Sequence, residues 1–178
     1  MLTVILIVVG AAVVVVLTLA SFRPNTFRVQ RSITVKAPPA AIFPMVNDFR
    51  KWPLWSPYEK LDPAMKRTFE GAESGKGAAY TWDGNKKAGA GRMEIIDSQL
   101  PGKLAMSLAF TRPFRANNSV TFTFVQESDG TSVTWIMDGT VPFIGKVMHV
   151  LINMDKMIGK DFEAGLARLK GISEDRTD

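Results

Sequence analysis

Apolar and polar residues alternate along much of the chain between residues 27 and 141, a pattern typical of strands that bury one face. The first such stretch is residues 27–37. Six more follow, separated by turn-forming sequences, at residues 66–71, 77–84, 91–99, 103–111, 118–128 and 131–141. The apolar positions of each stretch share one face, whereas Thr121 and Thr123 lie on the other. The pattern predicts a seven-stranded antiparallel sheet with one apolar face.

Residues 142–174 change to a helical period, with apolar residues at Val147, Leu151, Met154, Ile158, Phe162, Leu166 and Leu169. As one helix this segment approaches about 40 Å, and it is the only element long enough to cover the sheet. Gly159 and Gly165 would permit a close approach or a bend. A twisted sheet cannot touch one helix everywhere, so we expect a pocket between them. Residues 173–178 are polar and predict a disordered tail.

The segment after the first strand predicts two short helices. Ile42, Phe43 and Val46 share a face, and Pro44 should keep that helix short or kink it. The next sequence, FRKWPLWSPYEKLD at residues 49–62, is too polar for a core strand and too rich in proline for a regular helix.

This stretch carries Trp52 and Trp55 between two prolines, which stiffen it. Three interpretations stay open for its aromatic rings. They form a lid or wall of the pocket, or they plug the open end of the sheet without ligand contact. Alternatively, Trp55 and Tyr58 contact the membrane interface. Trp52 is the better candidate for an inward-pointing ring because it follows closely on the preceding helix face.

The first 22 residues contain no charged side chain, and as a helix they would span roughly 30 Å, the thickness of a bilayer core. Signal peptides have a basic start and a shorter apolar run, so a transmembrane anchor is favoured, although residues 18–20 resemble a weak cleavage site. Arg23, Arg28 and Arg31 follow the anchor and predict a single-pass inner or plasma membrane protein that faces the cytoplasm. Residues 23–27 form a linker of at most about 18 Å to a domain at residues 28–172.

Composition excludes several kinds of chemistry. The chain has no cysteine, which rules out disulfides and thiolate catalysis, and one histidine, His149, which rules out sites with two imidazoles. No carboxylate cluster suggests a metal, and we expect no cofactor. The net charge of +5 suits an anionic membrane or nucleic acid. Nucleic acid is disfavoured because the aromatic residues lie on the inward face of the sheet.

The inward residues are the candidates for binding a ligand. They are Trp52, Trp55, Tyr80, Trp82, Met106, Leu108, Phe110, Phe122, Phe124, Trp135, Met137, Leu151, Met154 and Ile158. Each of them also fits ordinary core packing. The nine methionines of the chain favour a pocket that adapts to apolar molecules of varied shape.

Catalysis has only weak candidates. Asp155, close to the apolar stripe of the last helix, and Tyr80 are the two side chains best placed to act as an acid or base. Arg92 and Glu94 alternate with inward residues and should face solvent, and His149 lies on the helix face expected to be wet. No nucleophile with an adjacent base is visible.

The order of elements resembles the START-like helix-grip (SRPBCC) superfamily, and within it the bacterial polyketide cyclase/dehydrase and lipid-transport group. Two segments carry the resemblance: DFRKWPLWSPYEKLDP after the first strand and helix, and MDKMIGKDFEAGLARLK in the last helix. It covers residues 27–172, and the membrane helix is an addition to it. The resemblance implies an α+β fold in which the sheet wraps around a long C-terminal helix and encloses an apolar cavity.

Three functions are compatible with these observations. The leading hypothesis is a membrane-anchored binding or carrier protein for lipids or other hydrophobic small molecules. The second is a polyketide-type cyclase or dehydratase, because the superfamily mixes enzymes with carriers. The third is an interaction or stress module without a ligand.

Overall fold

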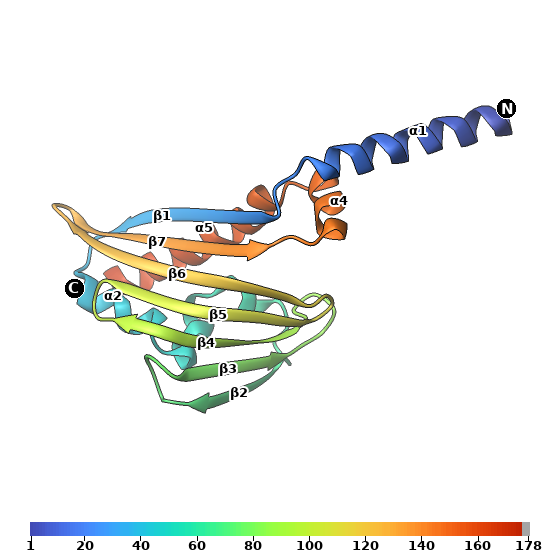
Figure 1. The fold of residues 1–178 in the computed structure, drawn as a ribbon. Coiled ribbons are helices and arrows are strands. Elements are labelled where there is room, and N and C mark those ends of the chain that lie inside the picture. The colour runs from blue at the N-terminus through green and yellow to red at the C-terminus, as the bar shows by residue number, and fades with distance from the viewer. Residues whose placement is uncertain (176–178) are drawn as a thin grey trace.

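A computed structural model describes residues 1–175, apart from the side chains of His149 and Leu151. Seven strands form one sheet in the order β1-β7-β6-β5-β4-β3-β2, and all neighbouring strands are antiparallel (Figure 1). The predicted sheet is confirmed. The strands are β1 (Thr26–Val35), β2 (Lys66–Gly71), β3 (Ala78–Asp83), β4 (Ala90–Gln99), β5 (Lys103–Arg112), β6 (Ala116–Glu127) and β7 (Gly130–Thr140).

One face of this sheet is buried, as the alternation predicts. In β6 the side chains of Val120, Phe122 and Phe124 are buried, and the two threonines between them are only half-buried. The C-terminal helix α5 (Met154–Glu174) and the short helices after β1 all lie on this face (Figure 1). They supply the second layer that the apolar face requires.

Two glycines allow α5 to approach the sheet closely. A Cβ on Gly159 would collide with the Arg31 side chain, and a Cβ on Gly165 would lie 2.9 Å from the Trp135 ring. The close approach expected at these glycines is therefore present.

The prediction of one continuous C-terminal helix is wrong in its first part. The segment forms α4 (Phe143–Leu151) and then α5, because Ile152 and Asn153 adopt extended backbone conformations between them. The Asn153 side chain accepts a hydrogen bond from the backbone N–H of Lys156 at 2.9 Å and so caps α5. With 21 residues, α5 is about 31 Å long rather than 40 Å. It extends through Ser173 and Glu174, which were expected in the tail, and Ser173 is buried.

The proline-rich segment after β1 forms a series of short helices. These are α2 (Pro39–Val46), η1 (Phe49–Lys51), α3 (Trp52–Trp55) and η2 (Pro57–Lys60). Each of α3 and η2 has a proline in its first two positions, where the missing N–H group costs nothing. Residues 49–60 are therefore more helical than their proline content suggested.

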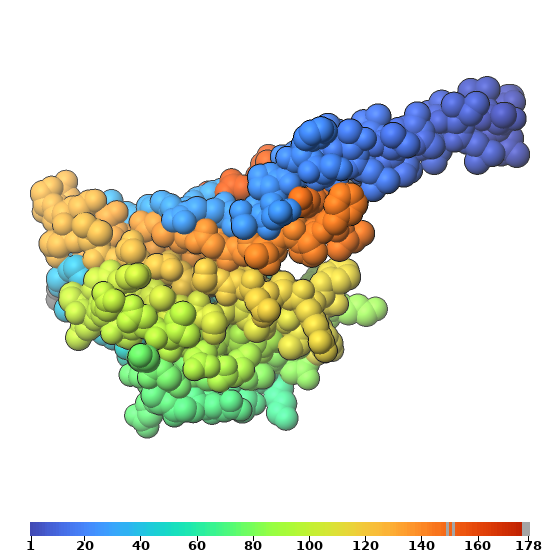
Figure 2. Space-filling model, in the orientation of Figure 1, coloured from blue at the N-terminus to red at the C-terminus, as the bar shows by residue number. Residues whose placement is uncertain are grey.

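The N-terminal helix α1 (Leu2–Ser21) projects from the rest of the molecule (Figure 2). It is long and apolar enough to cross a membrane, and its side chains are almost all exposed. Ala20 near its end is buried. The connection to the sheet is shorter than expected, because Thr26 and Phe27 already belong to β1.

Candidate functional site

A pocket of about 460 Å³ lies between the inner face of the sheet and α5, within the usual range for small-molecule sites. Tyr80, Met93 and Leu108 of β3, β4 and β5 lie side by side in its wall. The opposite side comes mainly from α5, with Met154, Ile158, Asp161 and Phe162. Most of this surface is apolar, which suits a hydrophobic ligand.

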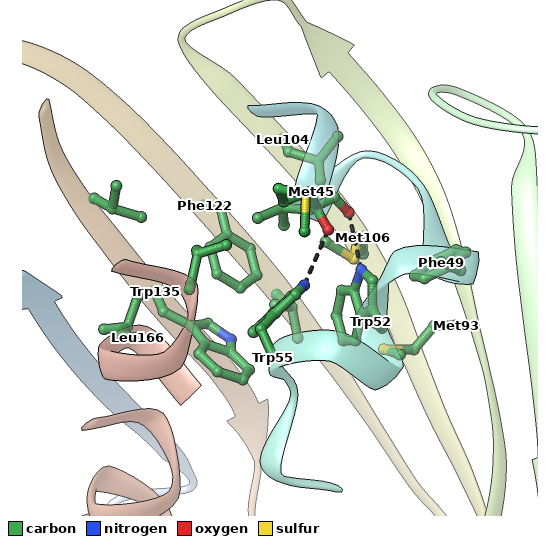
Figure 3. Packing of buried hydrophobic residues seen from close by; sticks show 14 of the residues in the cluster. Met45, Phe49, Trp52, Trp55, Met93, Leu104, Met106, Phe122, Trp135 and Leu166 are labelled. Atoms are coloured by element: carbon green, nitrogen blue, oxygen red, sulfur yellow. Dashed lines mark hydrogen bonds between the residues drawn. The ribbon is translucent and has the colours of Figure 1, made fainter. Parts of the chain in front are cut away.

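The pocket occupies only one half of the space under the sheet. The other half is solid, because α2 and α3 place large side chains against β5, β6 and β7 (Figure 3). Trp55 packs edge-to-face on Phe122 and Trp135, with ring centroids 6.0 and 5.5 Å apart. The boundary between the two halves is therefore aromatic.

The two tryptophans of α3 both point inward. Trp52 lines the pocket and Trp55 is fully buried behind it. Their indole N–H groups donate to the backbone carbonyls of Val46 and Met45 at 2.9 and 3.0 Å (Figure 3). These bonds tie α3 to the end of α2 and aim the rings. The interpretation of Trp55 as a membrane contact is wrong, because no part of its side chain is exposed.

The structure brings most of the candidate ligand-binding residues together. Nine of them line the pocket: Trp52, Tyr80, Trp82, Leu108, Phe110, Trp135, Met137, Met154 and Ile158. Four others lie in the solid half of the core or behind the pocket wall: Trp55, Met106, Phe122 and Phe124. The side chain of Leu151 lies outside the described part of the chain. The alternation of apolar and polar residues identifies the inner face of the sheet correctly. The large side chains of α2 and α3 then cover part of that face, and the pocket forms over the rest.

A polar network stands in the pocket wall. The Glu59 carboxylate, from η2, accepts hydrogen bonds from the Arg67 Nε–H and the Tyr80 hydroxyl, both at 2.7 Å. Its side chain is 5% exposed, so this is a nearly buried ion pair. Burial and the hydrogen bond to Glu59 both raise the pKa of Tyr80, which keeps its hydroxyl protonated.

Further polar residues line the pocket, from η2, the sheet and α5. Burial raises the pKa of Asp161, and burial together with that carboxylate raises the pKa of Tyr58. Three pocket residues carry a buried polar atom without a hydrogen-bond partner among the described residues: Ser56 Oγ, Asn118 Oδ1 and Trp135 Nε1. Buried polar atoms are normally paired, so these three are exceptions within the core around the pocket.

The weak catalytic candidate Asp155 lies elsewhere. It is mostly exposed at the start of α5 and pairs with Arg31 at 3.0 Å, while Arg31 also binds Glu163 at 2.7 Å. The Arg31 guanidinium lowers the pKa of Asp155, which makes it a weaker base rather than a stronger one. Asp155 does not line the pocket.

The mouth of the pocket lies at the end of the sheet where α1 and α4 attach. Its exposed lining residues mark it: Thr140 at the end of β7, Phe114 of the β5–β6 turn, Leu61 after η2 and Lys87 of the β3–β4 turn. Met157 in the first turns of α5 completes this rim, and it and Phe114 are both exposed.

Sequence reasoning overlooked several pocket residues. Glu59 and Asp161 stand out in hindsight, since each is a carboxylate next to large aromatic residues. Periodicity could not find Glu59, because η2 has no strand or long-helix pattern. Asp161 directly precedes the inward Phe162, so it lies at the edge of the helix's apolar face.

An antiparallel sheet that grips a C-terminal helix over a mostly apolar pocket defines a helix-grip domain, of the kind that binds hydrophobic ligands. The family model for polyketide cyclase / dehydrase and lipid transport matches residues 26–174, and the chain belongs to this family. No curated protein matches the chain.

Solved structures show the same fold at low sequence identity. The di-domain aromatase/cyclase StfQ from the steffimycin biosynthetic pathway has a TM-score of 0.67 at 12% identity, covering 86% of this chain and 52% of StfQ. A Thermobifida fusca protein has a TM-score of 0.62 at 20% identity, covering 82% of this chain and 92% of that one. The Aha1 dimer from Colwellia psychrerythraea has a TM-score of 0.59 at 12% identity, covering 83% and 96%.

Proposed function

We propose that this chain is a membrane-anchored binding or carrier protein that holds a lipid or similar apolar molecule in the pocket between the sheet and α5. The observation that carries this proposal is the position of the pocket mouth. The exposed part of the pocket lining lies at the end of the sheet to which α1, an apolar helix long enough to cross a bilayer, is attached. Such an arrangement would keep the pocket next to a membrane, the main source of apolar molecules.

The charges beyond α1 favour a cytoplasm-facing domain. Arg23, Arg28 and Arg31 follow the helix within ten residues of its last residue, Ser21. Positive charge next to a membrane span tends to stay on the cytoplasmic side. We therefore place the domain on the cytoplasmic face of the inner or plasma membrane.

The pocket favours a ligand that is apolar along most of its length and carries a polar group. Its methionines and aromatic rings adapt to an apolar chain or ring system. The Tyr80 hydroxyl and the Asp161 carboxyl belong to residues that line the pocket and would hydrogen-bond a polar group of the ligand. A fatty acid, a lipid or a polyketide-like molecule meets both requirements.

A pair of alanines on the two faces of the sheet provides a matched test. Ala116 lines the pocket, opposite Phe110 on the neighbouring strand, and Ala116→Phe should fill the space that a ligand needs. Ala109 faces the opposite side of β5, so Ala109→Phe adds the same ring outside the pocket.

The full-length chain in nanodiscs is irradiated with a diazirine-bearing fatty acid, and the labelled peptides are mapped by mass spectrometry. We expect labels on pocket residues such as Met93 and Met137. Those labels should be lost in Ala116→Phe and kept in Ala109→Phe. If labelling is confined to α1, or is unchanged in Ala116→Phe, the pocket does not bind this ligand.

One observation favours an enzyme as the second candidate. The Tyr80 hydroxyl and the Glu59 carboxylate share a short hydrogen bond in the pocket wall, and together they could move a proton. Incubation with a linear polyketide-like substrate, followed by mass spectrometry, separates the two functions. An enzyme produces a cyclised or dehydrated product that Tyr80→Phe abolishes, whereas a carrier returns the molecule unchanged.

A further inference from the structure

The helix α4 has the opposite arrangement to a helix on the surface of a soluble protein. Phe143, Ile144 and Met148 are 51%, 72% and 48% exposed, whereas the side chain of Lys146 is buried. In water, a surface helix normally turns its charged side outward and its apolar side to the core. The outward side of α4 is thus suited to an apolar environment.

This helix packs alongside α1. The two helices border a shallow apolar hollow formed by Val9, Ala12, Val13, Val16, Leu17 and Val147. Figure 2 shows α4 against the base of the projecting α1. Val9 and Leu17 precede the end of α1 at Ser21 by about 18 and 6 Å along the helix. If α1 spans the bilayer, most of this contact lies within the hydrocarbon of one leaflet, about 15 Å thick.

The backbone holds this arrangement in place. The start of β1 pairs with the end of β7, Thr26 opposite Thr140, and the Val141 N–H donates to the Asn25 carbonyl at 2.7 Å. Few residues separate this pairing from α1 on one side and from α4 on the other. Both helices therefore leave the sheet from one place, and α4 cannot move far from α1 without breaking these bonds.

We propose that α4 inserts its Phe143, Ile144 and Met148 face into the leaflet that α1 enters, and so holds the pocket mouth against the membrane surface. This inference rests on the proposed anchoring by α1. The rim residues Phe114 and Met157 are exposed and apolar, and they line the pocket at the same end of the sheet. Lys156 and Lys160, exposed in the first turns of α5, suit anionic headgroups. An apolar ligand would then pass from the leaflet into the pocket without crossing water.

The absence of cysteine makes every introduced cysteine a unique labelling site. Ile144→Cys reports on α4. Ile7→Cys, in the N-terminal half of α1, reports on the anchor. Val125→Cys, 57% exposed near the β6–β7 turn at the far end of the sheet, is the matched control for an exposed apolar position. Each full-length variant carries an environment-sensitive NBD label in nanodiscs of phosphatidylcholine with a minority of phosphatidylglycerol.

Spin-labelled lipids with the quencher at known acyl-chain depths then measure contact with hydrocarbon. We expect the labels at residues 7 and 144 to be quenched and shifted to shorter emission wavelength, and the label at residue 125 to remain accessible to aqueous iodide. If the label at residue 7 is quenched but the label at residue 144 stays accessible to iodide, like the one at residue 125, this inference is wrong and the anchoring by α1 still holds. No quenching at residue 7 removes the anchoring and this inference together. Protection of residue 144 from iodide without lipid quenching also overturns it, and indicates a second copy of the chain or another protein on α4.

Discussion

Removal of the cation beside Glu59 should destabilise the domain strongly. Arg67→Met deletes the partner of a carboxylate that is 5% exposed and leaves it only the hydrogen bond from Tyr80. Breaking a buried ion pair by removing one partner costs about 3–5 kcal/mol. We expect about 3 kcal/mol, the lower end of that range, because Arg67 itself is 24% exposed. For a domain of this size, that lowers the melting temperature by about 6–12 °C.

The assay is thermal unfolding of the full-length chain in detergent micelles, followed by the fluorescence of its four tryptophans, all of which lie in the domain. Arg92→Met is the matched surface control. Arg92 pairs with Glu94 at 2.6 Å on the outer face, where both side chains are well exposed, so its loss should cost no more than about 1 kcal/mol.

The double variant Arg67→Met with Glu59→Gln completes the test. It removes the buried charge as well as its partner, while the Gln amide oxygen can still accept from Tyr80. It should therefore be more stable than Arg67→Met alone. The reasoning is refuted if Arg67→Met costs no more than Arg92→Met, or if the double variant is as unstable as the single one.

Three further substitutions on α5 test the burial of Asp161 and the packing of the helix against the sheet. Burial raises the pKa of Asp161 above its ordinary value of 3.8. The folded state therefore keeps this proton to a higher pH than the unfolded chain does. The free energy of unfolding should fall as the pH rises from about 4 through the raised pKa, and Asp161→Asn should abolish that part of the pH dependence in denaturant titrations. Gly165→Ala should cost about 1–3 kcal/mol, because its Cβ would lie 2.9 Å from the Trp135 ring. Gly171→Ala in the same helix has nothing within 4 Å of its Cβ and should stabilise the protein slightly, so equal effects at the two glycines would contradict the packing argument.

The sheet was predictable because the sequence features that define its strands and turns lie close together along the chain. Each strand from β2 to β7 follows the previous one along the chain, and period-two alternation defines which side chains face inward. The separation of α4 from α5 was missed because the apolar positions continue at helical spacing across it. Asn153 with Asp155 two residues later is a helix-start signal, but it is weaker than the periodicity that surrounds it.

The candidate site was only partly predictable because its chemistry depends on distant pairs. Glu59 and Tyr80 are 21 residues apart and come from a short helical turn and a strand. No local pattern joins them. The direction of Trp55 was equally hidden, because it depends on a backbone carbonyl 10 residues earlier, at Met45. The helix α1, in contrast, was predictable from the sequence alone. A long uncharged apolar run identifies a possible membrane span whatever the rest of the chain contacts.

One topological fact explains why the pocket opens where it does. The start of β1 and the end of β7 meet at one end of the sheet, and the chain connects that end to both α1 and α4. Trp55, Phe122 and Trp135 form an aromatic cluster next to the pocket, and Trp135 lies flat on Phe162 of α5 at 4.0 Å. These rigid rings fill the space on their side of the pocket, so the unfilled volume reaches the end of the sheet where the two apolar helices are attached. Under the proposed anchoring, the packing that makes the domain stable also directs its pocket towards the membrane.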